Sequence, residues 1–227
     1  VFNHMGHYSF AFADVKKNQQ KSPYADWFTI KQWDNPNTPE NEFEYEGWFG
    51  VASLPEFKED EKGIVQGPRD YIFAATERWM NPMGKGPNFG IDGWRLDVAF
   101  CVKHAFWKDW RLHVKRLNPQ AYLTAEIVDT PEKVQPYLKG DEFDGEMNYN
   151  FAFTAIEFFA MPQGMNTTAT QFDTELEKLR NLYPKGVAYV CQNLYGSHDV
   201  NRIGSHLLNR GIGQFRDWGT YFRTSQA

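Results

Sequence analysis

The chain has 227 residues, of which 24 are Lys or Arg and 29 are Asp or Glu, giving a net charge of −5. A weakly acidic chain is poorly suited to non-specific binding of nucleic acid, and no stretch approaches the ~18 apolar residues that a membrane helix requires. We therefore expect neither nucleic acid nor a membrane as a partner. Its two cysteines, Cys101 and Cys191, are too few for a disulfide framework and are expected to be small buried residues.

Residues 5–67 are rich in Asn, Pro, Gly and aromatic side chains and show no sustained helical or strand period. A structureless loop of this length is uncommon in a compact domain. We expect a small lobe that is packed by its own aromatic residues.

Strand and helix patterns alternate from residue 68 onward. A helix is predicted from Pro68, with Ile72, Ala75 and Trp79 on its apolar face. The later segments are a strand at 91–98, a helix at 106–117, a strand at 122–127, a helix beginning at 130–131, a strand at 143–149, a helix at 172–183, a strand at 187–194 and a helix within 201–210. This alternation predicts a parallel α/β sheet with its active site at the carboxyl ends of the strands.

Three carboxylates, Asp97, Glu126 and Asp199, fall at or just beyond the ends of predicted strands. Arg95 lies two residues before Asp97, on the same face of the strand, and His198 precedes Asp199. A single strand-end Asp is usually a helix cap or a salt-bridge partner. Three carboxylates with these neighbours suit glycoside hydrolysis, which uses one protonated acid and one ionised nucleophile.

Several short segments resemble the motifs of the α-amylase family, glycoside hydrolase family 13. In the family's order they are residues 1–4 (VFNH), 93–99 (GWRLDVA), 125–127 (AEI) and 196–199 (GSHD). Residues 46–50 (EGWFG), 53–57 (SLPEF), 143–144 and 147–149 are similar to the neopullulanase and cyclomaltodextrinase branch of that family, which is bacterial in character.

The resemblance implies a (β/α)8 TIM barrel, here partial, from the end of strand three to after strand seven. Residues 5–67 would be a lobe inserted after strand three, and residues 1–4 and 68–227 would belong to the barrel. A ring of eight strands typically takes ~250 residues. We therefore expect the natural protein to be longer at both ends, or the remaining strands to come from another chain.

The resemblance also assigns roles. Asp97 would be the nucleophile, Glu126 the acid/base and Asp199 the third carboxylate, with the first two carboxyl groups about 5–5.5 Å apart as in retaining enzymes. Substrate-binding roles would fall to His4, Arg95, His198, Trp48 and Phe49. We expect at least one of Trp48 and Phe49 to stack on a sugar, and packing of the lobe onto the barrel is the alternative.

Two interpretations of function follow. The first is a retaining glycosidase acting on α-1,4-linked glucans such as starch, maltooligosaccharides, cyclodextrins or pullulan. The second is a catalytically silent carbohydrate-binding relative, or an inactive fragment. Phe100 and Cys101 stand where many α-amylases carry a Lys-His pair, and Val128 stands where an aromatic residue often occurs. These departures argue against an ordinary starch α-amylase.

No cofactor is required by the first interpretation. His4 and His7 lack a third ligand for zinc, whereas Asn3 occupies a position that often binds calcium in the family, so calcium is left open. The partner is expected to be an oligo- or polysaccharide. The sequence does not decide between a cytoplasmic location and a periplasmic or secreted one. It also does not decide whether the parent chain forms a homo-oligomer.

Overall fold

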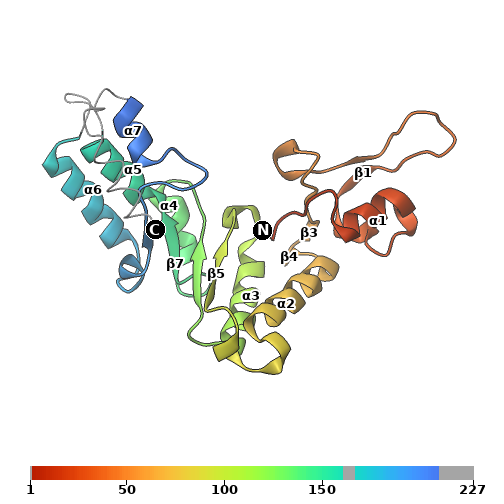
Figure 1. Ribbon diagram of the computed structural model, residues 1–227, viewed down its shortest axis with the longest axis horizontal. Helices are drawn as coiled ribbons and strands as arrows, with labels where there is room; N and C mark the ends of the chain where they lie inside the picture. Colours follow the sequence, from red (N-terminus) through yellow and green to blue (C-terminus); the bar gives the residue numbers. More distant parts are fainter. Residues whose placement is uncertain (1, 161–166, 210–227) are drawn as a thin grey trace. The chain divides into compact units, whose positions relative to one another are not determined.

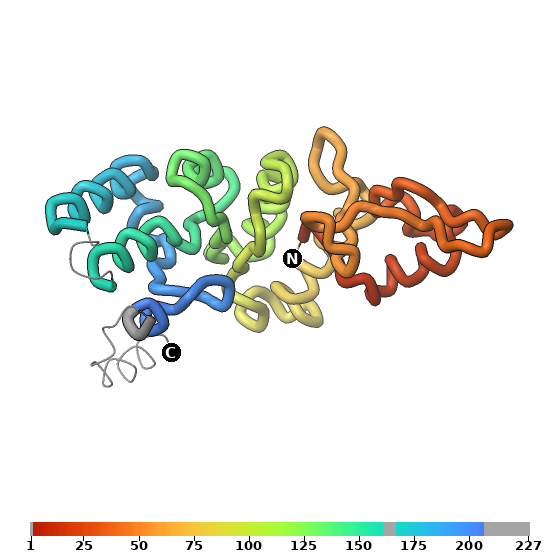
Figure 2. Tube along the Cα trace, turned by 90° about the horizontal axis from the view of Figure 1, so that it is seen from above, coloured from red at the N-terminus to blue at the C-terminus, as the bar shows by residue number. Residues whose placement is uncertain are grey.

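The computed structural model describes residues 2–160 and 167–209, and the chain divides into two compact units at the Leu123–Thr124 bond (Figures 1 and 2). Val1, Arg210 and the residues after it, including any further barrel strand, lie outside the described residues. None of the helices in the described ranges combines the length and the apolar character needed to cross a bilayer.

The helices and strands of the first unit are α1 (Phe10–Asn18), β1 (Ile30–Gln32), β2 (Glu44–Tyr45), β3 (Glu59–Asp60), β4 (Gly63–Ile64), α2 (Gln66–Met80), β5 (Gly93–Leu96) and α3 (His104–Leu117). The unit boundary falls within β6 (Tyr122–Ala125). The second unit continues with α4 (Pro131–Val134), β7 (Gly145–Asn148), α5 (Tyr149–Phe159), α6 (Ala169–Leu182), β8 (Gln192–Asn193) and α7 (Ile203–Asn209).

A helix in the first segment was not predicted. Helix α1 buries Ala11, Phe12 and Val15 completely. These buried positions span little more than one helical turn, so their spacing is hard to detect in the sequence. The Phe12 ring lies 4.9 Å from Phe28 and 4.5 Å from Tyr45, so α1 packs against the antiparallel pair β1–β2 (Figure 1). Aromatic side chains from within the segment thus form its core.

The helix predicted from Pro68 is present as α2, but only part of its expected apolar face is correct. Pro68, Ile72, Thr76 and Met80 are buried at intervals of four, whereas Trp79 is 58% exposed. The buried face packs on α3, where the Trp110 indole N–H donates to the Thr76 hydroxyl at 3.0 Å. A Thr with a hydrogen-bond partner can be buried where the sequence suggested a larger apolar side chain.

In the second unit β6, β7 and β8 form a parallel sheet, which confirms the prediction for these strands. Thr124 pairs with Gly145, and Met147 pairs with Gln192. Helices α5 and α6 pack against each other beside it (Figure 2), and the expected helices at 172–183 and within 201–210 correspond to α6 and α7. The helix α5, which directly follows β7, was not predicted.

The strand expected at 187–194 is mostly wrong. Residues Val187–Tyr189 form a 3₁₀ turn, and β8 is limited to Gln192–Asn193. The Val187 N–H donates to the Pro184 carbonyl at 2.8 Å, so the turn that follows α6 extends into the apolar run. Local turn geometry here overrides the β propensity of Val and Tyr.

Candidate active site

Asp97 directly follows β5, and its carboxylate forms a salt bridge with the Arg95 guanidinium. Both side chains leave the strand on the same face and are about one quarter to one third exposed. Val98 adopts a left-handed conformation, with φ 41° and ψ 48°, and turns the chain out of the strand. A β-branched residue in this conformation is strained, and such strain is often found at functional sites. The carboxylate is therefore held at a sharp turn by a fixed cation.

His4 lies close enough to Asp97 for the two to interact electrostatically. Burial lowers the pKa of His4, and the negative charge of Asp97 opposes that shift. Its Nδ1 is hydrogen-bonded to the Asn3 side-chain oxygen, which can only accept, so Nδ1 carries the proton. The Nε2 atom of the neutral ring is then available to accept a hydrogen bond from a substrate hydroxyl.

Trp48 and Phe49 occupy different surroundings. The Trp48 indole stacks on the His4 ring, with centroids 5.1 Å apart, and its N–H donates to the Cys101 sulfur at 3.4 Å. Phe49 is 74% exposed and has a left-handed backbone with φ 48°. Trp48 is thus anchored by protein contacts, whereas the Phe49 ring is open to a ligand.

Cys101 was expected to be a buried small residue, and the structure places it partly buried beneath Trp48. Burial raises the pKa of its thiol, with the carboxylates of Glu56, Glu59 and Asp97 contributing further. The thiol is therefore neutral near pH 7 and acts as a packing and accepting group. The departure at position 101 from the α-amylase pattern accommodates the indole.

Glu126 follows β6 in the second unit and is only 5% exposed. A carboxyl group this deeply buried needs hydrogen-bonding partners or a functional reason to be retained. Its neighbours along the strand, Thr124 and Ala125, pair with β7.

Asp199 and His198 lie on the loop that follows β8, and the His198 Nε2 atom is 3.3 Å from the Asp199 carboxylate. Ser197, which sequence reasoning did not single out, accepts a hydrogen bond from the Asp199 backbone N–H at 3.0 Å. The Ser197 hydroxyl also bonds the Tyr149 hydroxyl at 2.9 Å. Tyr149 and Ser197 thereby fix the loop that carries Asp199.

The Asn3 side chain, at a position where calcium was left open, has protein partners at both ends. The Asn3 amide nitrogen donates to Glu56 at 3.0 Å, and the amide oxygen faces His4, so neither end is free for a cation. A cavity of about 240 Å³ beside it has Glu46, Glu56 and Glu59 among its lining residues. Within the described ranges no group of three or more His, Cys, Asp or Glu side chains is arranged to hold a metal ion. The described residues around Asn3 do not fit calcium.

The family model "Alpha amylase, catalytic domain" matches residues 1–217. The chain is 38% identical to neopullulanase 2 of Thermoactinomyces vulgaris and 36% identical to a cyclomaltodextrinase of Geobacillus thermopakistaniensis, each over 203 residues. Both matches cover 89% of this chain and 32% of the relative, so the chain spans about a third of the length of these relatives.

Among solved structures, the debranching enzyme of Nostoc punctiforme superposes with a TM-score of 0.75 at 35% identity. The superposition covers 94% of this chain and 43% of that enzyme. This similarity, together with the parallel sheet of the second unit, identifies the architecture as an α/β fold of the TIM-barrel type.

Proposed function

This chain belongs to the α-amylase family, and from that premise we propose that the protein is a retaining glycosidase of α-1,4-linked glucans. The observation that carries the proposal is the environment of Asp97, a carboxylate held by Arg95 and set beside a neutral His4. Glu126 and Asp199, which follow β6 and β8, supply the other two carboxylates that the reaction requires.

The proposed reaction has two displacements. The Asp97 carboxylate attacks the anomeric carbon, the glycosidic bond breaks, and the leaving oxygen takes the proton of Glu126. Water then gives its proton to Glu126 and displaces Asp97 from the sugar, which restores both groups and retains the anomeric configuration. The Arg95 guanidinium holds the Asp97 carboxylate in place through their salt bridge.

Other side chains would position the substrate. His4 would accept a hydrogen bond from a sugar hydroxyl through Nε2, and Asp199 with His198 would bind hydroxyls and favour the distorted sugar ring. We assign the sugar-stacking role to Phe49, since its ring is exposed, and the positioning of His4 to Trp48.

The extent of the fold is part of the proposal. We propose that residues 5–67 form a lobe inserted after barrel strand three, and that the chain covers the barrel from the end of strand three to after strand seven. Relatives named neopullulanase and cyclomaltodextrinase support pullulan and cyclodextrins as substrates beside starch and maltooligosaccharides. Any homo-oligomer is proposed to form through parts of the parent chain outside these 227 residues.

Substitution of the two reacting carboxyl groups tests the proposal. Asp97→Asn and Glu126→Gln should each reduce kcat on maltooligosaccharides by at least ~10³-fold, because they remove groups that act in the transition state. Asp129→Asn is the matched control, since Asp129 is an exposed carboxylate three residues after Glu126 that pairs with Lys133. Proton NMR of the first product should show the α anomer.

The proposal fails if either variant keeps a tenth of the wild-type kcat, or if the first product is the β anomer. Unchanged circular dichroism spectra of the variants would show that the loss is chemical. If the wild-type protein binds maltooligosaccharides but turns over none of the substrates, the silent carbohydrate-binding relative becomes the correct description.

A further inference from the structure

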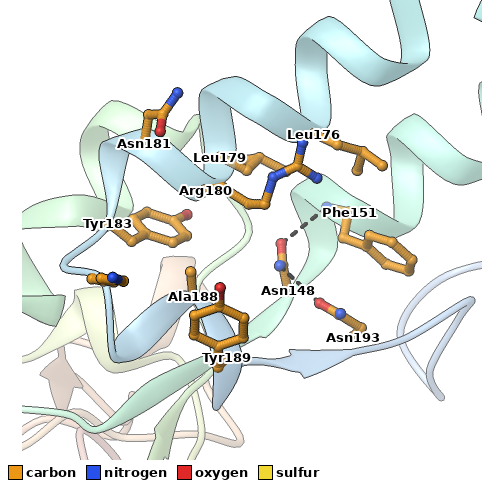
Figure 3. Close-up of a pocket in the computed structure, with 11 residues that line it drawn as sticks. Asn148, Phe151, Leu176, Leu179, Arg180, Asn181, Tyr183, Ala188, Tyr189 and Asn193 are labelled. Atoms are coloured by element: carbon orange, nitrogen blue, oxygen red, sulfur yellow. Dashed lines mark hydrogen bonds between the residues drawn. The ribbon is translucent and has the colours of Figure 1, made fainter.

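The second unit contains a pocket of about 680 Å³ that the proposed catalytic groups do not line. Its walls come from α6, the start of α5, β8 and the 3₁₀ turn Val187–Tyr189 (Figure 3). Pockets that bind small molecules typically measure ~300–1,000 Å³ and combine apolar walls with a few convergent polar groups. Here Leu176 and Leu179 supply part of the apolar wall.

The charge of this pocket is entirely positive. Arg180 and Lys185 contribute to its lining, and none of the described residues that line it is Asp or Glu. Figure 3 shows the Arg180 side chain extending from α6 over Asn148. The carboxylate of Asp173 is 3.9 Å from the guanidinium, and both side chains are more than half exposed. An exposed pair of that length is weak, so Arg180 can donate to a ligand.

A cation in the last turn of a helix is common, because it offsets the negative end of the helix dipole. That explanation covers Arg180 but not Lys185, which lies three residues beyond the end of α6. Two cations in a pocket without a carboxylate, in a chain with a net charge of −5, favour an anionic ligand.

The other polar groups suit a sugar. The Asn148 amide is fixed, since its oxygen accepts from the Phe151 N–H at 2.9 Å and its nitrogen donates to Asn193 at 3.0 Å. Asn193 therefore uses its oxygen within the protein and can offer its N–H groups to hydroxyls. Tyr189 is 81% exposed and forms one side of the pocket opposite Arg180 (Figure 3). An exposed ring beside amide donors is a suitable surface for a pyranose.

We infer that this pocket binds a monosaccharide that carries an anionic group, either a hexose phosphate or a hexuronate. The anion would lie between Arg180 and Lys185, the sugar ring against Tyr189, and a hydroxyl on Asn193. This site is separate from the hydrolytic reaction, because a neutral glucan has no use for two positive charges in a pocket without a carboxylate.

Calorimetric titration of the intact protein tests the inference with four probes: glucose 6-phosphate, glucuronate, glucose and inorganic phosphate. We expect one of the two anionic sugars to bind at least about tenfold more tightly than glucose and than inorganic phosphate, since charge-assisted hydrogen bonds add to the sugar contacts. The stronger of the two identifies the anionic group. Equal binding of inorganic phosphate overturns the assignment to a sugar, and equal binding of glucose overturns the assignment to an anion.

Three charge-removing variants locate the site. Arg180→Gln and Lys185→Gln should each weaken binding of the preferred anionic sugar by about tenfold or more. The matched control is Lys178→Gln, since Lys178 lies on the same helix, is 65% exposed and pairs with Glu175 instead of lining this pocket. Unchanged affinity in both test variants, or an equal loss in the control, refutes the site. The readout is binding, so its failure is distinct from failure of the proposed hydrolysis.

Discussion

Replacement of Glu146 by Gln should change how the stability of the protein depends on pH. Glu146 lies in the middle strand of the β6–β7–β8 sheet and is 0% exposed. One carboxyl oxygen accepts a hydrogen bond from the Tyr183 hydroxyl at 2.6 Å, and the other is buried without a hydrogen-bond partner among the described residues. Burial raises the pKa of Glu146 to about 7, and the hydrogen bond from Tyr183 opposes that shift. The neighbouring Cys191 thiol, whose pKa burial raises to about 11, stays neutral.

The direction in which the free energy of unfolding changes with pH follows from proton binding to Glu146 in the folded and unfolded chains. Below pH 4.5 the carboxyl group is protonated in both the folded and the unfolded chain, so it contributes no pH dependence. Between 4.5 and 7 the unfolded chain releases the proton while the folded chain retains it, so the free energy of unfolding falls as pH rises. At 1.36 kcal/mol per pKa unit, the loss from this group over that window is about 3 kcal/mol.

The amide side chain introduced by Glu146→Gln does not titrate, so this loss should disappear. The variant should therefore gain stability relative to wild type as pH rises from 4.5 to 7.5, by about 3 kcal/mol in total. Urea unfolding followed by circular dichroism, at four pH values and constant ionic strength, measures the difference. Glu157→Gln is the control, because Glu157 is an exposed carboxylate on α5 in the same unit. Parallel stability profiles of wild type and Glu146→Gln, within about 0.5 kcal/mol, would refute the reasoning.

Three further predictions concern the first unit. Thr76→Val should lower the free energy of unfolding by about 1–3 kcal/mol, since it leaves the buried Trp110 indole N–H without its acceptor. Thr76→Ser keeps the hydroxyl and should show only a small part of that loss. Urea unfolding measures both variants. Phe49→Ala should raise KM for maltooligosaccharides without changing Tm, because the ring is 74% exposed. Trp48→Ala should lower both Tm and kcat, because it removes the ring that packs on His4, and an unchanged kcat would contradict this role for Trp48.

Most elements after residue 68 could be predicted because their apolar periods are long, although α5 was missed and β8 is much shorter than the strand expected at 187–194. Helix α3 shows its buried face directly in the sequence, at Phe106, Trp107, Trp110 and Val114. Trp79 was misplaced because a large aromatic residue at helical spacing is normally buried, and only the pairing of Thr76 with Trp110 shows which face turns inward. Such a tertiary hydrogen bond leaves no periodic signal in one sequence.

In the candidate site, too, some features could be predicted from the sequence and others could not. Asp97 and Glu126 could be singled out from the sequence because each directly follows a strand, and Asp199 could be singled out by its motif. The roles given to them stay predictions. The supporting contacts could not be predicted, since the Trp48–Cys101 hydrogen bond joins residues 53 positions apart and the Tyr149–Ser197 bond joins residues 48 positions apart. Glu146 gave no signal either, because a Glu is seldom fully buried and its partner Tyr183 lies 37 positions later in the sequence.

These supporting contacts link residues 5–67 to Asp97, the proposed nucleophile. His4 and Trp48 precede Asp97 by many residues, yet the indole stacks on a ring that interacts electrostatically with the Asp97 carboxylate. The indole N–H also donates to Cys101, four residues after that carboxylate. Trp48 therefore contacts one residue that precedes β5 in the sequence, His4, and one that follows it, Cys101. Displacement of the Trp48 backbone would alter the packing of His4. A change in this segment can consequently affect catalysis without removing any group that reacts with the substrate.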